Sequence, residues 1–178
     1  MEAIDTLYNG NYFRSRLEAR WAYFFDEVEV KYEYEPQGFK SSKGECYLPD
    51  FYLPDTYLRH SDNKGIYIEI KPESHTSGHI PAAFWFDRNL VLFEGQPIKN
   101  IFTEYCIKNE FGGVELHTDG MDFPMLFWRC WVCEGSKIDF HHRSNDYCPV
   151  CHRDEACDPY IETAAKKAMM KRFEHLNL

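Results

Sequence analysis

Three side chains suited to metal-dependent hydrolysis lie on two short apolar segments. Asp50 follows Pro49 within Leu-Pro-Asp-Phe-Tyr, and Glu69 and Lys71 belong to Tyr-Ile-Glu-Ile-Lys. Residues two apart in a strand point to the same face, so Glu69 and Lys71 are predicted to be neighbours. A hairpin centred near residues 59–60 would bring Asp50 opposite Glu69. Two carboxylates this close repel each other, which favours a divalent cation between them.

Four cysteines form a second chemical pattern. Cys130-Trp-Val-Cys133 and Cys148-Pro-Val-Cys151 are separated by fourteen residues, which is close to the spacing of two zinc knuckles. A tetrahedral zinc ion would supply much of the folding energy of so small a module, because it has almost no core of its own. The spacing therefore predicts a structural Zn²⁺ site with these four thiolates as ligands.

Alternatives to this ligand set remain open. The two pairs could instead be redox dithiols or ordinary buried cysteines, although their spacing favours metal. A hairpin from Lys137 to His142 is predicted to return the chain between the two pairs. Four nearby residues could each replace one cysteine as a ligand: His141, His142, His152 and Cys157.

Periodic patterns in the first half of the chain predict the elements that position the carboxylates. Residues 13–27 place large apolar side chains at helical spacing and predict an amphipathic helix. Residues 28–35 alternate apolar and charged side chains, which predicts a strand ended by Pro36. Further strands are predicted at 47–53 and 66–72, joined by a polar stretch typical of an antiparallel hairpin.

The second half of the chain contains weaker patterns. A short apolar run within residues 73–89 predicts one or two helical turns. A fourth strand is predicted at residues 90–93. Residues 101–117 are predicted to form a hairpin, with a helix at 99–111 as the competing interpretation. An N-cap and first-turn signal at residues 158–159 predicts a basic C-terminal helix.

The carboxylate pattern resembles the motif of the PD-(D/E)xK nuclease superfamily. Pro-Asp at residues 49–50 matches the first half of that motif, and Glu-Ile-Lys at 69–71 matches the second. In that superfamily a helix bearing an acid precedes the sheet, and the predicted helix is similar, with Glu18 in the place of the acid. The resemblance covers roughly residues 13–97. It implies an α/β fold with a restriction-endonuclease-like mixed sheet flanked by helices.

The resemblance also implies an activity and its residues. A Mg²⁺ or Mn²⁺ ion would be held by Asp50, Glu69 and the Ile70 carbonyl, with Glu18 contributing through water. Lys71 would orient the attacking water and steady the charge of the transition state. The implied enzyme is a divalent-metal-dependent deoxyribonuclease, with RNA left open as a substrate. Family members usually continue into a long helix after the lysine, whereas the short spacing to the next predicted strand leaves little room for one.

Basic residues are the candidate contacts to nucleic acid, because affinity for phosphate comes mainly from Lys and Arg. A purely structural interpretation is the alternative. In it, Glu18 pairs with Arg14 one helical turn away, while Glu69 and Lys71 are solvated charges on an edge strand. The candidate nucleic-acid-binding residues are Arg14, Arg16, Arg143, Lys167 and Lys171.

Length and composition predict the organisation of the chain. Its 178 residues suit one compact domain with a small appendage. We predict a nuclease-like core at 1–125, a zinc ribbon at 126–157 and a basic C-terminal helix at 158–178. The hydrophobic fraction of 44% excludes wholesale disorder, because it supplies enough apolar surface for a core.

Cysteine usage and hydropathy predict the compartment. Seven cysteines, four of them in Cys-x-x-Cys pairs, point to metal rather than disulfides and hence to a cytoplasmic protein. No apolar run approaches the ~18–20 residues of a membrane span, so no membrane partner is expected. The pattern assigns no role to Cys46, Cys106 or Cys157.

The net charge of −9 counts against a protein that coats nucleic acid. It is compatible with clustered carboxylates that hold a metal ion. Two other classes stay open. One is a non-catalytic nucleic-acid-binding or adaptor protein, and the other is an inhibitor that presents acidic surface to a DNA-binding partner. A protein partner or a homo-oligomer is compatible with either. In the adaptor, the ribbon would bind through Trp131, His141, His142 and Arg143.

Overall fold

The computed structural model of the chain describes residues 4–40, 44, 46–58, 64–72, 89–97 and 160–173, together with the backbone of 104–108, 114–118, 125–129 and 136–140. Its elements, in chain order, are β1 (Thr6–Tyr8), β2 (Asn11–Phe13), α1 (Arg16–Glu27), β3 (Glu33–Tyr34), β4 (Phe39–Lys40), β5 (Cys46–Tyr47), β6 (Phe51–Leu58), β7 (Lys64–Lys71), β8 (Leu90–Glu94), β9 (Glu104–Lys108), β10 (Val114–Thr118), β11 (Met125–Arg129), β12 (Ser136–Phe140) and α2 (Tyr160–Met170).

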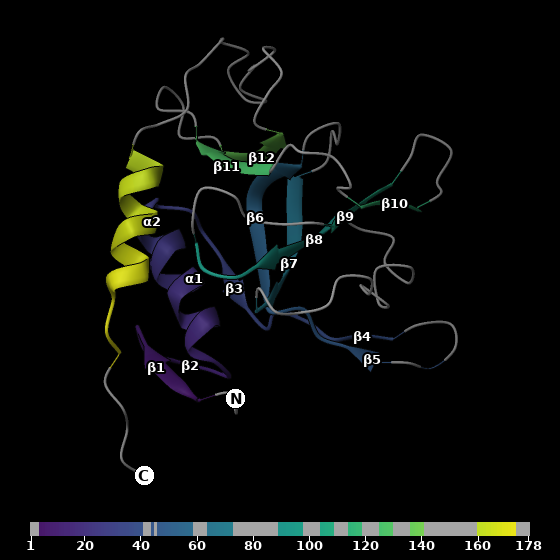
Figure 1. Cartoon of the computed structure of the whole chain (residues 1–178). Helices are drawn as coiled ribbons and strands as arrows, with labels where there is room; N and C mark the ends of the chain where they lie inside the picture. The colour runs from purple at the N-terminus through teal and green to yellow at the C-terminus, as the bar shows by residue number, and fades with distance from the viewer. Residues whose placement is uncertain are drawn as a thin grey trace.

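A mixed β-sheet forms the centre of the fold. Its strands lie in the order β10-β9-β8-β7-β6-β12-β11, and β3 pairs with the beginning of β6. The central strand β7 is antiparallel to β6 and parallel to β8. Helices α1 and α2 lie side by side next to the sheet (Figure 1). The described elements therefore confirm the expected α/β class with a mixed sheet.

The hydrophobic core lies between the helices and one face of the sheet. Trp21 of α1 is fully buried, and its ring lies 4.5 Å from that of Phe93 on β8, measured between centroids. Burying a large apolar side chain contributes about 1.5–3 kcal/mol, so such aromatic contacts fix α1 on the sheet. The second helix joins the same core through three small buried residues: Ala164, Ala165 and Ala168.

The two faces of β7 carry different side chains. Ile66, Ile68 and Ile70 belong to the hydrophobic core. Because side chains alternate along a strand, the intervening Glu69 and Lys71 point to the opposite face of the sheet, away from the core. The fold thus separates the apolar face that packs the helices from a face that carries ionisable groups.

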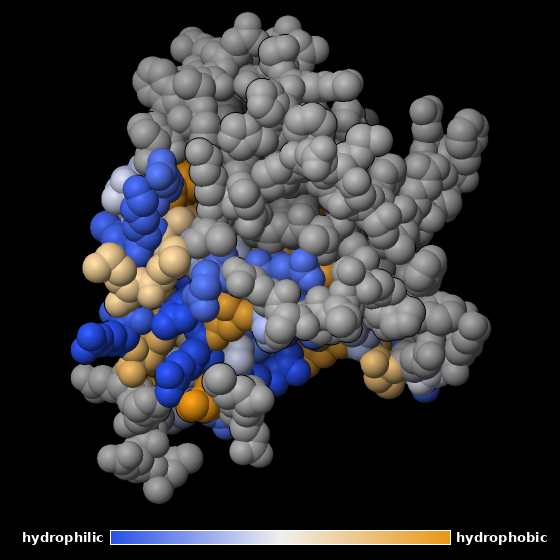
Figure 2. Space-filling view, viewed as in Figure 1, coloured by the Kyte–Doolittle hydropathy of each residue, from blue (hydrophilic) through white to orange (hydrophobic). Residues whose placement is uncertain are grey.

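The described surface of the helices mixes polar and apolar residues. Figure 2, viewed as Figure 1, shows hydrophilic residues at α2 with hydrophobic ones between them. Met170 is 81% exposed and Met169 is 43% exposed. Of the helices in the described part of the chain, none is long and apolar enough to cross a membrane.

Helix α1 begins later than the predicted residue 13. Phe13 belongs to β2, and Ser15 is the N-cap, with its hydroxyl accepting a hydrogen bond from the Glu18 N–H at 3.2 Å. A serine in this place satisfies one of the amide groups that the first helical turn leaves unpaired. Arg14 therefore lies before the helix, and its spacing to Glu18 is not a helical one.

The predicted strand at 28–35 is wrong over most of its length. Glu29 adopts a left-handed conformation with φ 54°. The Val30 N–H donates to the Phe25 carbonyl at 2.9 Å, and the Glu29 N–H donates to the Asp26 carbonyl at 3.1 Å. These two bonds form a Schellman motif, which ends α1. The alternating pattern at residues 28–30 reflects this helix end, and only Glu33–Tyr34 forms a strand.

The other predicted strands agree better with the structure. The segment 47–53 is divided at Leu48 and Pro49 between β5 and β6, because proline has no N–H for a strand ladder. The strands predicted at 66–72 and 90–93 are confirmed as β7 and β8. The hairpin predicted at 101–117 is confirmed as the antiparallel pair β9 and β10. The competing helix is therefore wrong over 104–108.

The hairpin predicted from Lys137 to His142 is wrong where the structure describes it. Ser136–Phe140 is a single strand, β12, which pairs antiparallel with β11 and parallel with β6. The strands on either side of the first cysteine pair thus extend the central sheet. The four cysteines predicted to bind zinc lie outside the described residues, as do Cys157, residues 73–88 and the predicted N-cap at 158–159. The helix predicted to follow that cap is confirmed as α2.

Candidate active site

The carboxylates of Asp50 and Glu69 lie at the junction of β6 and β7. In the antiparallel register of these strands, Phe51 is paired with Ile68. Continuing this register by one residue places Asp50 opposite Glu69, as predicted from the hairpin. Both residues are buried, with 3% of Asp50 and 8% of Glu69 exposed. The sheet therefore holds two carboxylates next to each other and largely shielded from water.

Pro49 changes the hydrogen bonding at this end of the ladder. The register continued by one further residue puts Pro49 opposite Ile70. The Ile70 N–H donates to Asp50 Oδ2 at 2.7 Å. Proline has no N–H to donate, so Pro49 cannot extend the β6 ladder through its own amide. The backbone of Ile70, whose carbonyl is the predicted metal ligand, is instead held by the Asp50 side chain.

Arg14 holds the other oxygen of Asp50. Its Nη2 donates to Asp50 Oδ1 at 2.7 Å, and its Nε lies 2.6 Å from Glu35 Oε1. The Arg14 amide also donates to the Tyr34 hydroxyl at 3.0 Å. The pKa of Arg14 is raised from its ordinary value, because these neighbours outweigh the effect of burial. The alternative interpretation, in which Arg14 and Glu18 form a helix-surface pair, is wrong, since the ion pairs of Arg14 are with Asp50 and Glu35.

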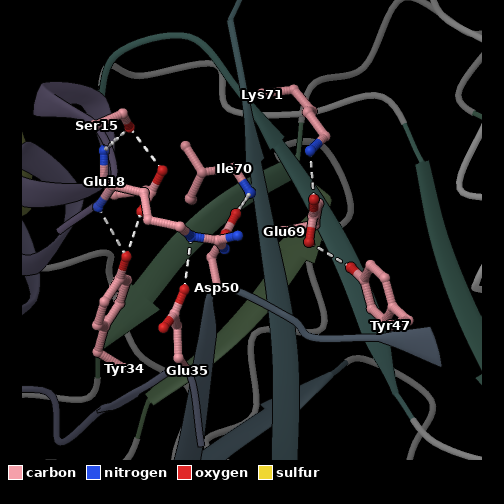
Figure 3. A network of polar contacts seen from close by, with 10 residues as sticks. Ser15, Glu18, Tyr34, Glu35, Tyr47, Asp50, Glu69, Ile70 and Lys71 are labelled. Atoms are coloured by element: carbon pink, nitrogen blue, oxygen red, sulfur yellow. Dashed lines mark hydrogen bonds and ion pairs between the residues drawn. The ribbon is translucent and has the colours of Figure 1, made fainter. Parts of the chain in front are cut away.

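Glu18 lies at the start of α1 with both oxygens bonded to hydroxyl groups. Ser15 donates to Oε1 at 2.7 Å and Tyr34 donates to Oε2 at 2.6 Å. The pKa of Tyr34 is raised, first by burial and next by its hydrogen bond to Glu18. Figure 3 shows Glu18 on the same side of the site as Asp50. Glu18 thus bonds to the N-cap side chain of its own helix and adds negative charge near Asp50.

Glu69 has two donors of its own. Lys71 donates from Nζ to Glu69 Oε1, and Tyr47 of β5 donates from its hydroxyl to Oε2 (Figure 3). The contact confirms the prediction that Glu69 and Lys71 share a face. β7 lies between β6 and β8, so the alternative that placed these residues on an edge strand is wrong. The pKa of Tyr47 is raised by burial and then by the charge of Glu69.

The electrostatic balance around Asp50 is unusual. Burial and then the charge of Glu69 raise the pKa of Asp50 from 3.8 to about 7, and Glu18 adds to the shift. The Ile70 N–H and Lys71 oppose it but do not cancel it. The folded chain therefore disfavours the ionised form of Asp50 relative to an exposed aspartate. Arg14 already pairs with this carboxylate at 2.7 Å, and a bound divalent cation would add further positive charge that favours the ionised form.

The donor set fits a hard divalent cation. Mg²⁺ is usually bound by one or two carboxylates together with several waters. Asp50, Glu69 and the Ile70 carbonyl would supply such oxygen ligands, and water would complete the set. Among the described residues, no group of three or more His, Cys, Asp and Glu side chains gathers as a metal cage.

The predicted nucleic-acid-binding residues that the structure describes make different contacts. Arg14 contacts the carboxylate cluster through Asp50 and Glu35. Lys167 donates from Nζ to Glu27 Oε2 at 2.6 Å, which joins α2 to α1, and Lys171 lies over the ring of Tyr23. These two lysines thus help to dock α2 against α1. Arg16 is in the first turn of α1, and Arg143 lies outside the described residues.

Three residues of the site were not predicted from the sequence: Tyr34, Glu35 and Tyr47. Tyr47 was assigned to the same strand as Asp50, and it reaches Glu69 because the chain bends between β5 and β6. Tyr34 and Glu35 were assigned to an ordinary alternating strand. Pro36 gave no signal of this arrangement, because a residue before proline favours an extended backbone. Glu35 has a φ of 46°.

Comparison of the chain with protein-family models, with curated proteins and with solved structures finds no match. The site is therefore interpreted from its own geometry.

Proposed function

We propose that the chain is a divalent-metal-dependent nuclease that hydrolyses phosphodiester bonds in DNA. The observation that carries this proposal is the pair of buried carboxylates, Asp50 and Glu69, on adjoining strands with Lys71 at the same face. Burying two negative charges together is costly unless a cation joins them. The raised pKa of Asp50 supports the need for such a cation.

In the proposed mechanism each residue has a separate task. A bound Mg²⁺ or Mn²⁺ ion would lower the pKa of a coordinated water and stabilise charge on the phosphate. Asp50, Glu69 and the Ile70 carbonyl would hold the ion, and Glu18 adds negative charge nearby. Lys71 places its ammonium beside Glu69, where it can orient the attacking water and stabilise the charge that develops on the phosphate oxygens.

The activity is tested with a panel of substrates. The chain is incubated with linear, circular, single-stranded and branched DNA and with RNA, in Mg²⁺, Mn²⁺ or chelator, and the products are resolved on gels. We expect metal-dependent cleavage of DNA by the wild type and none by Glu69→Gln. Glu33→Gln, which changes an exposed carboxylate on β3, is expected to cleave like the wild type. Cleavage of RNA alone would correct the substrate class.

A non-catalytic adaptor is the second candidate. One observation favours it, because both carboxylates already have protein donors: Arg14 for Asp50, and Lys71 and Tyr47 for Glu69. A polar network of this kind can act as a scaffold. Nucleic-acid binding that persists without cleavage in every divalent metal would establish this candidate and reject the nuclease.

The zinc ribbon remains a prediction with its own test. We expect about one zinc ion per chain, as a single four-thiolate site requires, and loss of that zinc when Cys130 or Cys148 is changed to serine. A missing thiolate leaves the tetrahedral site incomplete. Metal analysis of protein purified without chelator measures the zinc content, and Cys46→Ser, at an exposed cysteine, is the matched control. Zinc-free wild-type protein would contradict the prediction.

A further inference from the structure

Arg14 covers the side of Asp50 that faces the solvent. The Asp50 side chain is 5% exposed, whereas that of Arg14 is 54% exposed. Asp50 Oδ2 accepts the Ile70 N–H from within the sheet, and Asp50 Oδ1 accepts from Arg14. A cation that approaches Asp50 from solvent therefore meets the guanidinium first. Positive charges this close repel each other, so the metal and Arg14 compete for the same carboxylate.

A second anchor keeps Arg14 at the site when it leaves Asp50. Its Nε is paired with Glu35 at 2.6 Å. Glu35 itself is fixed, because its N–H donates to the Asp50 carbonyl at 2.9 Å and its backbone has a φ of 46°. Non-glycine residues rarely adopt such a conformation, and they tend to do so at functional sites. With Nε held by Glu35, the Nη atoms can turn to another anion without leaving the site.

The geometry points to Arg14 as an exchangeable counter-ion, an inference that rests on the proposed nuclease function. Arg14 neutralises Asp50 while the metal is absent. Metal binding releases its Nη atoms from Asp50, and they then bind a non-bridging phosphate oxygen of the nucleic acid. A guanidinium suits this exchange, because its fork of donors fits carboxylate and phosphate oxygens alike. Metal binding and substrate binding are thereby coupled through one side chain.

Titration calorimetry with Mg²⁺ and no nucleic acid tests the competition. We expect Arg14→Gln to bind Mg²⁺ about fivefold or more tightly than the wild type, a typical size for coupling between two ligands. The titrations are run at one and the same pH for the wild type and all variants. Lys31→Gln is the matched control, because it removes the same charge from an exposed pair with Asp55. That control is expected to bind Mg²⁺ like the wild type.

A measurement on the wild-type chain covers the case in which Arg14→Gln fails to fold. The Nε–H signal of Arg14 in a nitrogen-15 NMR spectrum is identified by its loss in Arg14→Lys. We expect this signal to persist, held by Glu35, but to shift as Mg²⁺ is added. A second shift is expected when a short duplex DNA is added to the Mg²⁺-bound protein.

The outcomes separate the two proposals. If the wild type cleaves DNA and binds Mg²⁺, but a folded Arg14→Gln binds Mg²⁺ no more tightly, the exchange is rejected and the nuclease function stands. An Arg14 signal that is unchanged at saturating Mg²⁺ also rejects the exchange. If the wild type neither binds Mg²⁺ nor cleaves, both proposals fail together.

Discussion

Asp50→Asn is expected to abolish cleavage and, at pH 8, to raise the free energy of unfolding of the metal-free protein by on the order of 2–4 kcal/mol. The loss of activity follows from removal of a charged metal ligand. The gain in stability follows from removal of a buried carboxylate whose folded-state pKa is raised from 3.8 to about 7. A single substitution would thus lower the cleavage activity while raising the stability of the metal-free fold.

The sign of the stability effect depends on pH. Below about pH 4 Asp50 is protonated in both the folded and the unfolded chain, so it contributes no difference. As pH rises from about 4 to 7, the unfolded chain releases this proton while the folded chain retains it, and stability falls. Above pH 7 Asp50 is ionised in both states, and the loss in the free energy of unfolding caused by its buried charge is complete. A shift of about three pH units at ~1.4 kcal/mol each gives the upper figure, and loss of the Arg14 ion pair lowers it.

Urea denaturation at pH 4 and pH 8 measures this effect. The wild type and Asp50→Asn are expected to differ in the free energy of unfolding at pH 8 and to have similar values at pH 4. Asp55→Asn is the matched control, because Asp55 is an exposed carboxylate on β6, the strand that follows Asp50. If the wild type were as stable as Asp50→Asn at both pH values, the negative charges of the carboxylate pair would be fully compensated by protein groups without metal, contrary to this prediction.

The sequence predicted the relative positions of the carboxylates because their spacing matches the register of β6 and β7 next to the site. This register is not kept along the whole pair, since it shifts between Leu53 and Tyr57. Residues 51–53 pair with 66–68, and this register depends on the spacing of two strongly apolar strands. The alternation of side chains along a strand predicted that Glu69 and Lys71 share a face. Side-chain alternation in a strand is fixed by backbone geometry, so no knowledge of the surrounding structure was needed.

The partners of those carboxylates could not be predicted in the same way. Arg14 reaches Asp50 because Ser15 caps α1 and leaves Arg14 outside the helix, where it faces the sheet. Tyr47 reaches Glu69 because the chain bends at Pro49 between two strands. Both contacts depend on the residue at which a helix or strand ends. A given hydrophobic pattern in the sequence is compatible with ends that differ by several residues. Long-range contacts made at such ends are settled by tertiary packing.

Lys71→Met is expected to lower the cleavage rate by about 10²–10³ and to leave the fold intact. The substitution keeps much of the length of the side chain and removes the ammonium. Removing one group that stabilises transition-state charge has an effect of this size in other hydrolases. Lys71 is partly exposed and at the end of β7, so its loss removes little packing.

Single-turnover cleavage and Mg²⁺ titration together measure the role of Lys71. Mg²⁺ affinity should be unchanged or tighter in Lys71→Met, since Glu69 loses a competing cation, while the rate of the chemical step falls. Lys64→Met is the matched control at the opposite end of β7, where the lysine is half exposed beside Asp55. It is expected to cleave at the wild-type rate.

The relative size of the loss in cleavage rate in Glu18→Gln and Lys71→Met distinguishes a catalytic site from a purely structural network. Glu18→Gln should be milder than Lys71→Met, because the amide oxygen of glutamine can still accept from Ser15 or Tyr34. In the proposed mechanism Glu18 would also contribute to the ion only through water. A structural network would give the opposite order, because Glu18 bonds to the N-cap Ser15 and to Tyr34, whereas Lys71 lies at the end of a strand. Cleavage by Lys71→Met at the wild-type rate would remove the nuclease assignment from these residues and leave the adaptor in its place.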